Sequence, residues 1–252
     1  MAKIVVFDSG LGSISIIKEI KKIMKTDIVY FADQKNYPYG NKSQAQIASI
    51  IKKTINMLEE KFTPDIIVVA SNTPSLMLNL QSKKVVDVKP PLKLAQKKSK
   101  SKKIGILATK ASVNSKGLEN YVKENNIPKS YKIFKINGSN LVDLVESGKF
   151  LNNKKYCKKI IKKSLDDYII TEKIDTITLS STHLLFLKTL LEKEFPQVEF
   201  IDPGSLVAKK IFLKIKNKQS KRNSLKIFTS GDIINFKNKL NKIGIKNKIN
   251  YL

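Results

Sequence analysis

With 252 residues, of which 41% are hydrophobic and 27% charged, the chain suits one large folded domain or two small ones. No apolar run reaches the roughly 20 residues of a membrane helix. The N-terminal MAKIVVFDSG begins a strand pattern without signal-peptide features, so we expect a cytoplasmic protein with no membrane partner. The net charge of +27 comes almost wholly from scattered lysines, with Arg222 the sole arginine. This argues against specific nucleic-acid readout and leaves non-specific electrostatic attraction.

The first part of the chain alternates short apolar strands with helical segments, a pattern that predicts parallel α/β units. The expected strands cover residues 3–7, 28–33 and 65–70, and the expected helices cover 14–25 and 43–61. Pro38, Tyr39 and Gly40 indicate a turn. Residues 86–103 contain two prolines and a lysine run, so they are predicted to connect two lobes.

The pattern then starts again. Strands are expected at 103–109, 131–136 and 175–180, and helices at 113–125, 140–148 and about 152–171. After 199–204 and a basic linker, residues 225–232 predict one more strand and helix, packed on the first lobe. We expect the first lobe to comprise residues 1–95 and about 208–252, and the second lobe residues 96–207.

An aspartate-led strand that ends at a serine occurs in each half, from Asp65 to Ser71 and from Asp175 to Ser181. This repetition predicts an internal duplication. The expected fold is therefore α/β, with two pseudo-symmetric lobes, each a mostly parallel sheet flanked by helices, and a ligand cleft between them.

Polar clusters follow the predicted strands at their carboxyl ends, where open parallel sheets bind ligands. These clusters are Asp8-Ser9, Ser71-Asn72-Thr73, Thr109 and Ser181-Thr182-His183. The alternative is that they only cap the following helices. Helix caps do not require the sole histidine or a matched pair of serines, so we favour a functional site.

Other site classes fit the sequence poorly. Gly10-x-Gly12 is not a complete phosphate-binding motif, and Asp8 would place a carboxylate where a phosphate should lie. Neither Ser71 nor Ser181 stands in the G-x-S-x-G motif of a hydrolase, and one histidine cannot serve both. The single cysteine, Cys157, rules out an internal disulfide or a cysteine-based zinc site, and we expect no metal.

The motifs taken together resemble the glutamate racemase family of the aspartate/glutamate racemase superfamily. In chain order they are FDSGLGS, YFAD, YPYG, VVASNTPS, GILAT, LVESG, LSSTH, IDPG and TSGD. The resemblance implies racemisation of glutamate without a cofactor, by proton transfer at Cα between two thiols. It also implies a homodimer, an acidic amino acid (glutamate or aspartate) as ligand, and a supply of D-glutamate for peptidoglycan.

The resemblance further implies which residues form the site. The family's two cysteines match Ser71 and Ser181 of this chain. Asp8, Glu146 and His183 match the groups that assist the thiols, although spacing alone does not bring Glu146 to the site. The positions that match the substrate-binding residues are Asp8, Ser9, Tyr39, Gly40, Asn72, Thr73, Thr182 and His183.

Serine at both thiol positions changes the expected chemistry. A thiol has a pKa of about 8.5 that its surroundings can lower, whereas a hydroxyl is a far weaker acid and a poor base for a Cα proton. We therefore expect a weakly active or inactive racemase, as in a pseudoenzyme or a chain with engineered serines. The alternatives are a non-racemising binding or regulatory protein, or another reaction with His183, Asp8 or Glu146 as base.

Overall fold

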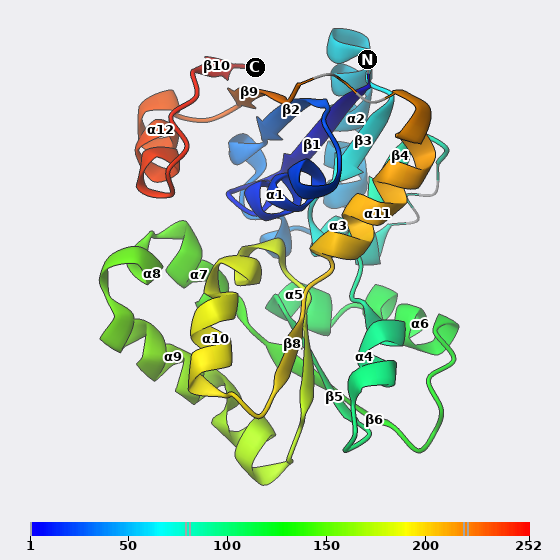
Figure 1. The fold of residues 1–252 in the computed structure, drawn as a ribbon, viewed down its shortest axis with the longest axis vertical. Coiled ribbons are helices and arrows are strands. Elements are labelled where there is room, and N and C mark those ends of the chain that lie inside the picture. Colours follow the sequence, from blue (N-terminus) through cyan, green and yellow to red (C-terminus); the bar gives the residue numbers. More distant parts are fainter. Residues whose placement is uncertain (1, 79, 81, 219, 221) are drawn as a thin grey trace. The chain divides into compact units, whose positions relative to one another are not determined.

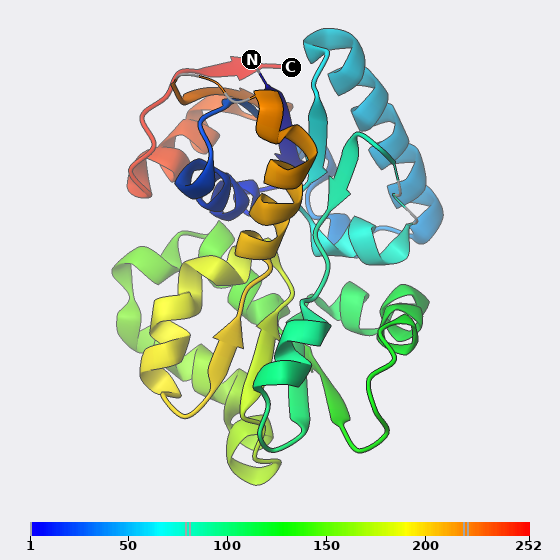
Figure 2. The same cartoon turned by 45° about the vertical axis from the view of Figure 1, so that its right-hand side comes forward.

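The computed structural model describes residues 2–78, 80, 82–218, 220 and 222–252. The chain folds into two compact units, one of Met1–Val88 with Gly204–Leu252 and one of Lys89–Pro203. Each unit contains its own parallel sheet with helices beside it (Figures 1 and 2). The predicted α/β class is therefore confirmed.

The first unit is built on a six-stranded sheet in the order β10-β9-β2-β1-β3-β4, in which all pairs are parallel. Its middle strands are almost continuously apolar and buried, as expected for a parallel sheet that is covered on both faces. The strands are β1 (Lys3–Asp8), β2 (Asp27–Ala32), β3 (Ile66–Val69), β4 (Val85–Asp87), β9 (Ser224–Thr229) and β10 (Ile249–Tyr251).

Helices cover both faces of this sheet (Figure 1). On one face, Ile47, Ile51 and Leu58 of α2 pack with Val5 and Phe7 of β1. On the other face α1 packs against α11. The helical segments of this unit are α1 (Ser13–Ile23), η1 (Gln34–Asn36), η2 (Tyr39–Asn41), α2 (Gln44–Phe62), α3 (Asn72–Met77), α11 (Gly204–Ile215), η5 (Lys216–Lys218) and α12 (Ile233–Lys242).

The second unit has a four-stranded parallel sheet in the order β6-β5-β7-β8. Its strands are β5 (Lys103–Ala108), β6 (Lys132–Asn137), β7 (Thr176–Leu179) and β8 (Glu199–Ile201). Its helical segments are α4 (Leu92–Lys98), α5 (Lys110–Val113), α6 (Lys116–Glu124), α7 (Ser139–Glu146), α8 (Lys149–Asn152), α9 (Lys154–Asp166), η3 (Asp167–Thr171), η4 (Thr182–Leu187) and α10 (Lys188–Glu194). The buried core joins Leu107 of β5 and Ile177 of β7 to Leu141 of α7 and Ile161 of α9.

Three segments differ from the sequence-based expectation. The predicted connection at 86–103 contains part of β4 and all of α4, and the basic segment after Gly204 begins with α11. The helix expected over about 152–171 is divided into the end of α8, then α9, then the π-helical turn η3. Asn153 interrupts it because its side chain accepts a hydrogen bond from the backbone of Tyr156 and starts a new helix. Because these segments are rich in lysine, the spacing of their apolar residues alone does not reveal such short elements.

The repeated aspartates Asp65 and Asp175 brace the amino ends of their strands. Asp65 accepts hydrogen bonds from the backbone nitrogen of Lys3 at 2.9 Å and from Nζ of Lys218 at 2.7 Å. Asp175 accepts from Oγ of Ser99 at 2.7 Å and from the backbone nitrogen of Ser101 at 2.6 Å. Burial raises the pKa of Asp175, but these hydrogen bonds outweigh it and hold that pKa below its ordinary value.

We expect Asp175→Asn to destabilise the protein by roughly 1–3 kcal/mol at pH 7, because hydrogen bonds to a charged acceptor are lost. The folded-state pKa lies below the unfolded value of about 3.9, so the stabilisation is present above that pH and is lost as the pH falls through the folded-state pKa. Urea unfolding at pH 7, 5 and 3 should show the difference shrinking at the lowest pH. Asp143→Asn, at an exposed position, is the control. A difference that stays constant with pH would contradict this role.

Candidate functional site

The first group of site residues lies at the carboxyl ends of β1 and β3. Asp8 ends β1, is 1% exposed, and accepts a hydrogen bond from the backbone nitrogen of Ser9 at 2.6 Å. Ser71, Asn72 and Thr73 follow β3, where α3 begins. We call seven residues the first half-site: Asp8, Ser9, Tyr39, Gly40, Ser71, Asn72 and Thr73.

Asn72 is the one member of the first half-site whose side chain is both buried and without a hydrogen-bond partner in the described residues. It is 3% exposed, and neither its amide nitrogen nor its amide oxygen is bonded. A buried amide that forms no hydrogen bond costs several kcal/mol. Such groups are usually satisfied by water or a ligand, so Asn72 is a candidate contact for a polar ligand at this point.

Tyr39 is held by Asp33, a residue that the sequence analysis did not select. The Tyr39 hydroxyl donates to Oδ2 of Asp33 at 2.9 Å, and the amide of Asn36 donates to both carboxylate oxygens at 2.9 Å. Burial, followed by the negative charges of Asp33 and Asp8, raises the pKa of Tyr39 well above its usual value. Tyr39 therefore stays a hydrogen-bond donor at neutral pH. Asp33 is the last residue of the YFAD motif, and this motif together with YPYG was the signal available in the sequence.

The second group, in the other unit, contains Ser181, Thr182, His183 and Glu146, which we call the second half-site. The first three follow β7 and begin η4, and all three are buried. Glu146 ends α7, and its Oε1 lies 2.7 Å from Nε2 of His183. The structure thus joins two residues that are 37 positions apart. A buried carboxylate bonded to one ring nitrogen fixes the orientation and tautomer of the imidazole.

Ser71 and Ser181 have the same local conformation. Their φ and ψ angles are −142° and 127° for Ser71, and −145° and 131° for Ser181. Each stands at the N-cap position, but neither side chain makes a capping hydrogen bond. Thr109 differs, since its hydroxyl caps α5 by accepting from the backbone of Ser112 at 3.3 Å. Helix capping therefore explains Thr109 and does not explain the two serine hydroxyls.

The lone thiol, Cys157, belongs to the core and to neither half-site. It is fully buried in α9, among apolar residues that include Ile161 and Leu165. Burial raises its pKa above the ordinary value. The Cys157 thiol is thus disfavoured as a base and cannot take the place of a thiol at Ser71 or Ser181.

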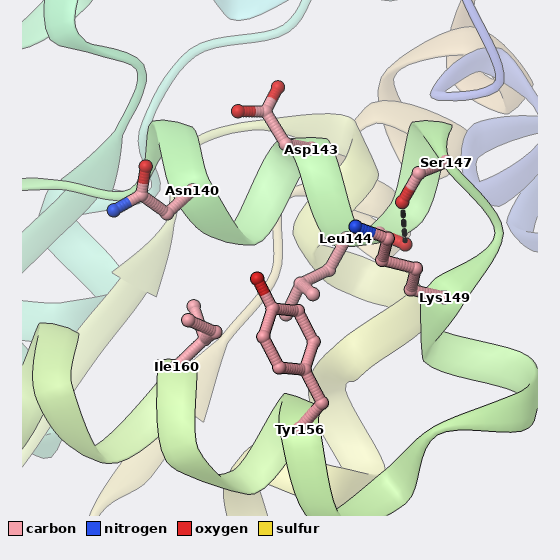
Figure 3. A pocket seen from close by; sticks show the side chains of 7 residues that line it. All are labelled: Asn140, Asp143, Leu144, Ser147, Lys149, Tyr156 and Ile160. Atoms are coloured by element: carbon pink, nitrogen blue, oxygen red, sulfur yellow. Dashed lines mark hydrogen bonds between the residues drawn. The ribbon is translucent and has the colours of Figure 1, made fainter.

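A pocket of about 300 Å³ lies in the second unit, against α7, α8 and α9 (Figure 3). Ser147 at its edge donates a hydrogen bond to the carbonyl of Leu144 at 3.3 Å. None of the residues that line it belongs to a half-site, and most are exposed. The lining residues are Asn140, Asp143, Leu144, Ser147, Lys149, Tyr156 and Ile160.

In the described part of the chain, no group of three or more histidine, cysteine, aspartate or glutamate side chains is placed to hold a metal ion. Among the described helices, none combines the length and the apolar character needed to cross a bilayer.

Two units, each with a parallel sheet and with polar residues at the carboxyl ends of its central strands, define a two-lobe α/β protein. No family model matches the chain. It is 33% identical over 233 residues to glutamate racemase of Aquifex pyrophilus, which covers 90% of this chain and 87% of that protein. It is 30% identical over 227 residues to glutamate racemase of Buchnera aphidicola, with 87% and 88% covered. The chain therefore belongs to the glutamate racemase family.

A solved structure supports the same fold. Glutamate racemase of Escherichia coli, solved in complex with L-glutamate and an activator, superposes with a TM-score of 0.82. The match covers 100% of this chain and 98% of that one at 22% identity, a likeness that concerns the fold.

The contact between Glu146 and His183 predicts a specific NMR result. As the sole histidine, His183 gives one unambiguous set of ring signals. We expect a ring protonated on Nε2, with a slowly exchanging proton shared with Glu146. Glu146→Ala should speed the exchange of that proton or change the tautomer, since the acceptor is gone.

Glu119→Ala serves as the control, because that exposed glutamate pairs with Lys135 on the surface of the same unit. The ¹⁵N shifts of the ring would contradict the assigned contact if they showed protonation on Nδ1, or no response to Glu146→Ala.

Proposed function

We propose that this chain binds glutamate and racemises it slowly or not at all, because Ser71 and Ser181 replace the thiols of the family. The observation that carries the binding part is the unpaired, buried amide of Asn72. Family membership carries the identity of the ligand. The finer parts of the proposal are action without a cofactor, a homodimer, a cytoplasmic location, and D-glutamate for peptidoglycan as the product.

An α-amino acid supplies what the first half-site lacks. The amide nitrogen of Asn72 can donate to a carboxylate oxygen, and its amide oxygen can accept from an ammonium group. Asp8, buried and anionic when ionised, offers the matching charge for that ammonium. In the E. coli relative the structure holds L-glutamate, and we propose the same class of ligand here.

The proposed loss of racemisation follows from the chemistry of the hydroxyl group. Racemisation needs one group to remove the Cα proton and another to return a proton to the opposite face. We assign Ser71 and Ser181 to the two base positions because they match the family's two cysteines. Their like conformations and the absence of capping bonds are consistent with that assignment. A serine hydroxyl is scarcely ionised near neutral pH, so neither residue is an effective base.

The second half-site offers a different role for its ionisable residues. Glu146 and His183 are bonded to each other, so the Nε2 atom of His183 is already occupied. We propose that this pair orients and polarises the group at Ser181, as a base–orienter pair does in other enzymes. Thr182, buried beside it, and Thr73 in the first half-site would hold ligand carboxylates.

Exchange of the Cα proton in D₂O tests the chemistry. The unaltered chain should exchange the proton of L- or D-glutamate slowly or not at all. Ser71→Cys/Ser181→Cys should raise the rate by roughly 10²–10⁴-fold, the usual worth of a positioned acid or base.

Each single cysteine variant should exchange mainly one enantiomer, since it restores the base on one side only. Ser164→Cys, in the outer part of α9, is the matched control for adding a thiol. Rapid exchange by the unaltered chain would overturn the proposed inactivity.

Calorimetry with glutamate tests the binding. Asn72→Ala should weaken binding by roughly 10- to 100-fold, because the ligand loses hydrogen bonds to a buried amide. Asn247→Ala is the control, since this exposed amide lies in the same unit and bonds to the backbone of Leu225.

Absence of glutamate and aspartate binding in the unaltered chain would refute the proposed function. Tight, salt-sensitive binding to DNA in that case would favour a nucleic-acid role.

A further inference from the structure

The C-terminal turn, residues 229–232 (Thr-Ser-Gly-Asp), begins at the last residue of β9. It belongs to neither half-site and has no role in the proposed reaction. Strand β9 lies beside β2 over its whole length, with Thr229 opposite Ala32. The turn therefore meets the segment that follows β2, which runs from Asp33 to Asn41 and contains Tyr39 and Gly40 of the first half-site. We call residues 33–41 the site segment.

Ser230 ties this turn to the start of the site segment. Its hydroxyl donates to Oδ1 of Asp33 at 3.2 Å and accepts from the backbone nitrogen of Lys35 at 3.1 Å. Its own backbone nitrogen donates to the carbonyl of Ala32 at 3.1 Å. Ser230 is 6% exposed and Asp33 3% exposed, so these bonds are shielded from water.

Neighbouring residues of the turn fit against the same segment. The Thr229 hydroxyl lies 2.9 Å from Oε1 of Gln34 and accepts from the backbone nitrogen of Gly231 at 3.1 Å. A Cβ atom at Gly231 would lie 2.6 Å from Cβ of Gln34, closer than real Cβ atoms approach. Only glycine fits there without a shift, so the turn and the site segment are in close contact.

Asp33 passes this restraint on to the first half-site. Its Oδ2 accepts from the Tyr39 hydroxyl at 2.9 Å, and Tyr39 is followed directly by Gly40. Asn36 and Tyr39 belong to the site segment itself, so their bonds to Asp33 close the segment on itself. The bond from Ser230 is different because it fixes the carboxylate to a neighbouring strand of the sheet.

We propose that Ser230 is a positioning residue that holds Asp33, and through it Tyr39 and Gly40, in place for the ligand. Its role for the ligand rests on the proposed function, whereas its effect on the site segment can be measured without a ligand. The C-terminal turn then acts on the first half-site through Asp33, which contacts both Ser230 and Tyr39.

The test compares Ser230→Ala with Ser224→Ala. Ser224, the first residue of β9, donates to Oδ1 of Asp27 at 2.8 Å at the opposite end of the same pair of strands. Each variant therefore removes one serine–aspartate bond between β9 and the β2 region, and only the first should affect the site segment. Ser230→Ala also removes the acceptor of the Lys35 nitrogen, so the Lys35 amide is left out of the exchange comparison. Hydrogen exchange of peptides covering residues 33–42 and glutamate calorimetry are measured on both, with Ser230→Thr as the conservative rescue.

We expect Ser230→Ala to raise amide exchange in residues 33–42 by at least about fivefold and to weaken glutamate binding by roughly 5- to 10-fold, the effect of one hydrogen bond. Ser224→Ala should change neither, and Ser230→Thr should keep both near the parent values. Equal effects of the two alanine variants, or unchanged exchange in 33–42 with Ser230→Ala, would overturn the proposal.

Two controls keep the test decisive. If Ser230→Ala does not fold, Ser230→Cys replaces it, since a thiol is only a weak hydrogen-bond donor to Asp33. If the unaltered chain binds no glutamate, the proposed function fails, but the exchange of residues 33–42 still decides whether Ser230 positions the segment.

Discussion

Each half-site depends on a backbone hydrogen bond at the equivalent position of its own sheet. In the first unit the nitrogen of Ala70 donates to the carbonyl of Phe7 at 2.8 Å, and in the second the nitrogen of Ser180 donates to the carbonyl of Leu107 at 2.8 Å. Each bond continues a parallel strand pair for one residue beyond its last ladder position. The next residue in each case is the serine, which leaves the sheet in an extended conformation. Parallel pairing thus places these hydroxyls without help from their own side chains.

The same pairing explains why the positions of several candidate site residues could be predicted from sequence. A parallel sheet brings the carboxyl ends of its strands to one edge, so strand patterns alone located Asp8, Ser71 and Ser181. Glu146 was different, because its contact with His183 depends on how α7 packs against η4. The contact between Asp33 and Ser230 was also beyond sequence patterns, since the pairing of β9 with β2 joins residues 197 apart. Such contacts depend on topology, which periodicity does not reveal.

The duplicated aspartates show how one sequence signal can combine structure and function. The spacing from Asp65 to Ser71 and from Asp175 to Ser181 predicted a repeated unit. The residues at the two ends of this repeated segment have different roles. At the amino ends the carboxylates hold neighbouring loops, through Lys218 in one unit and Ser99 in the other. At the carboxyl ends the serines make no cap. The repeated strand pattern therefore has a stabilising carboxylate at one end and a candidate ligand contact at the other.

In the proposed function, binding and proton transfer separate because they depend on different atoms. Binding would rely on groups that need only be present and oriented, such as the Asn72 amide and the Asp8 carboxylate, both buried at the strand ends. Proton transfer also requires a base whose pKa lies near the working pH, and a hydroxyl does not meet that condition. The backbone of the two serines is alike and extended, so both residues leave their sheets in the same way. This chain would then keep the ligand contacts that we propose while lacking the two thiol bases of the family.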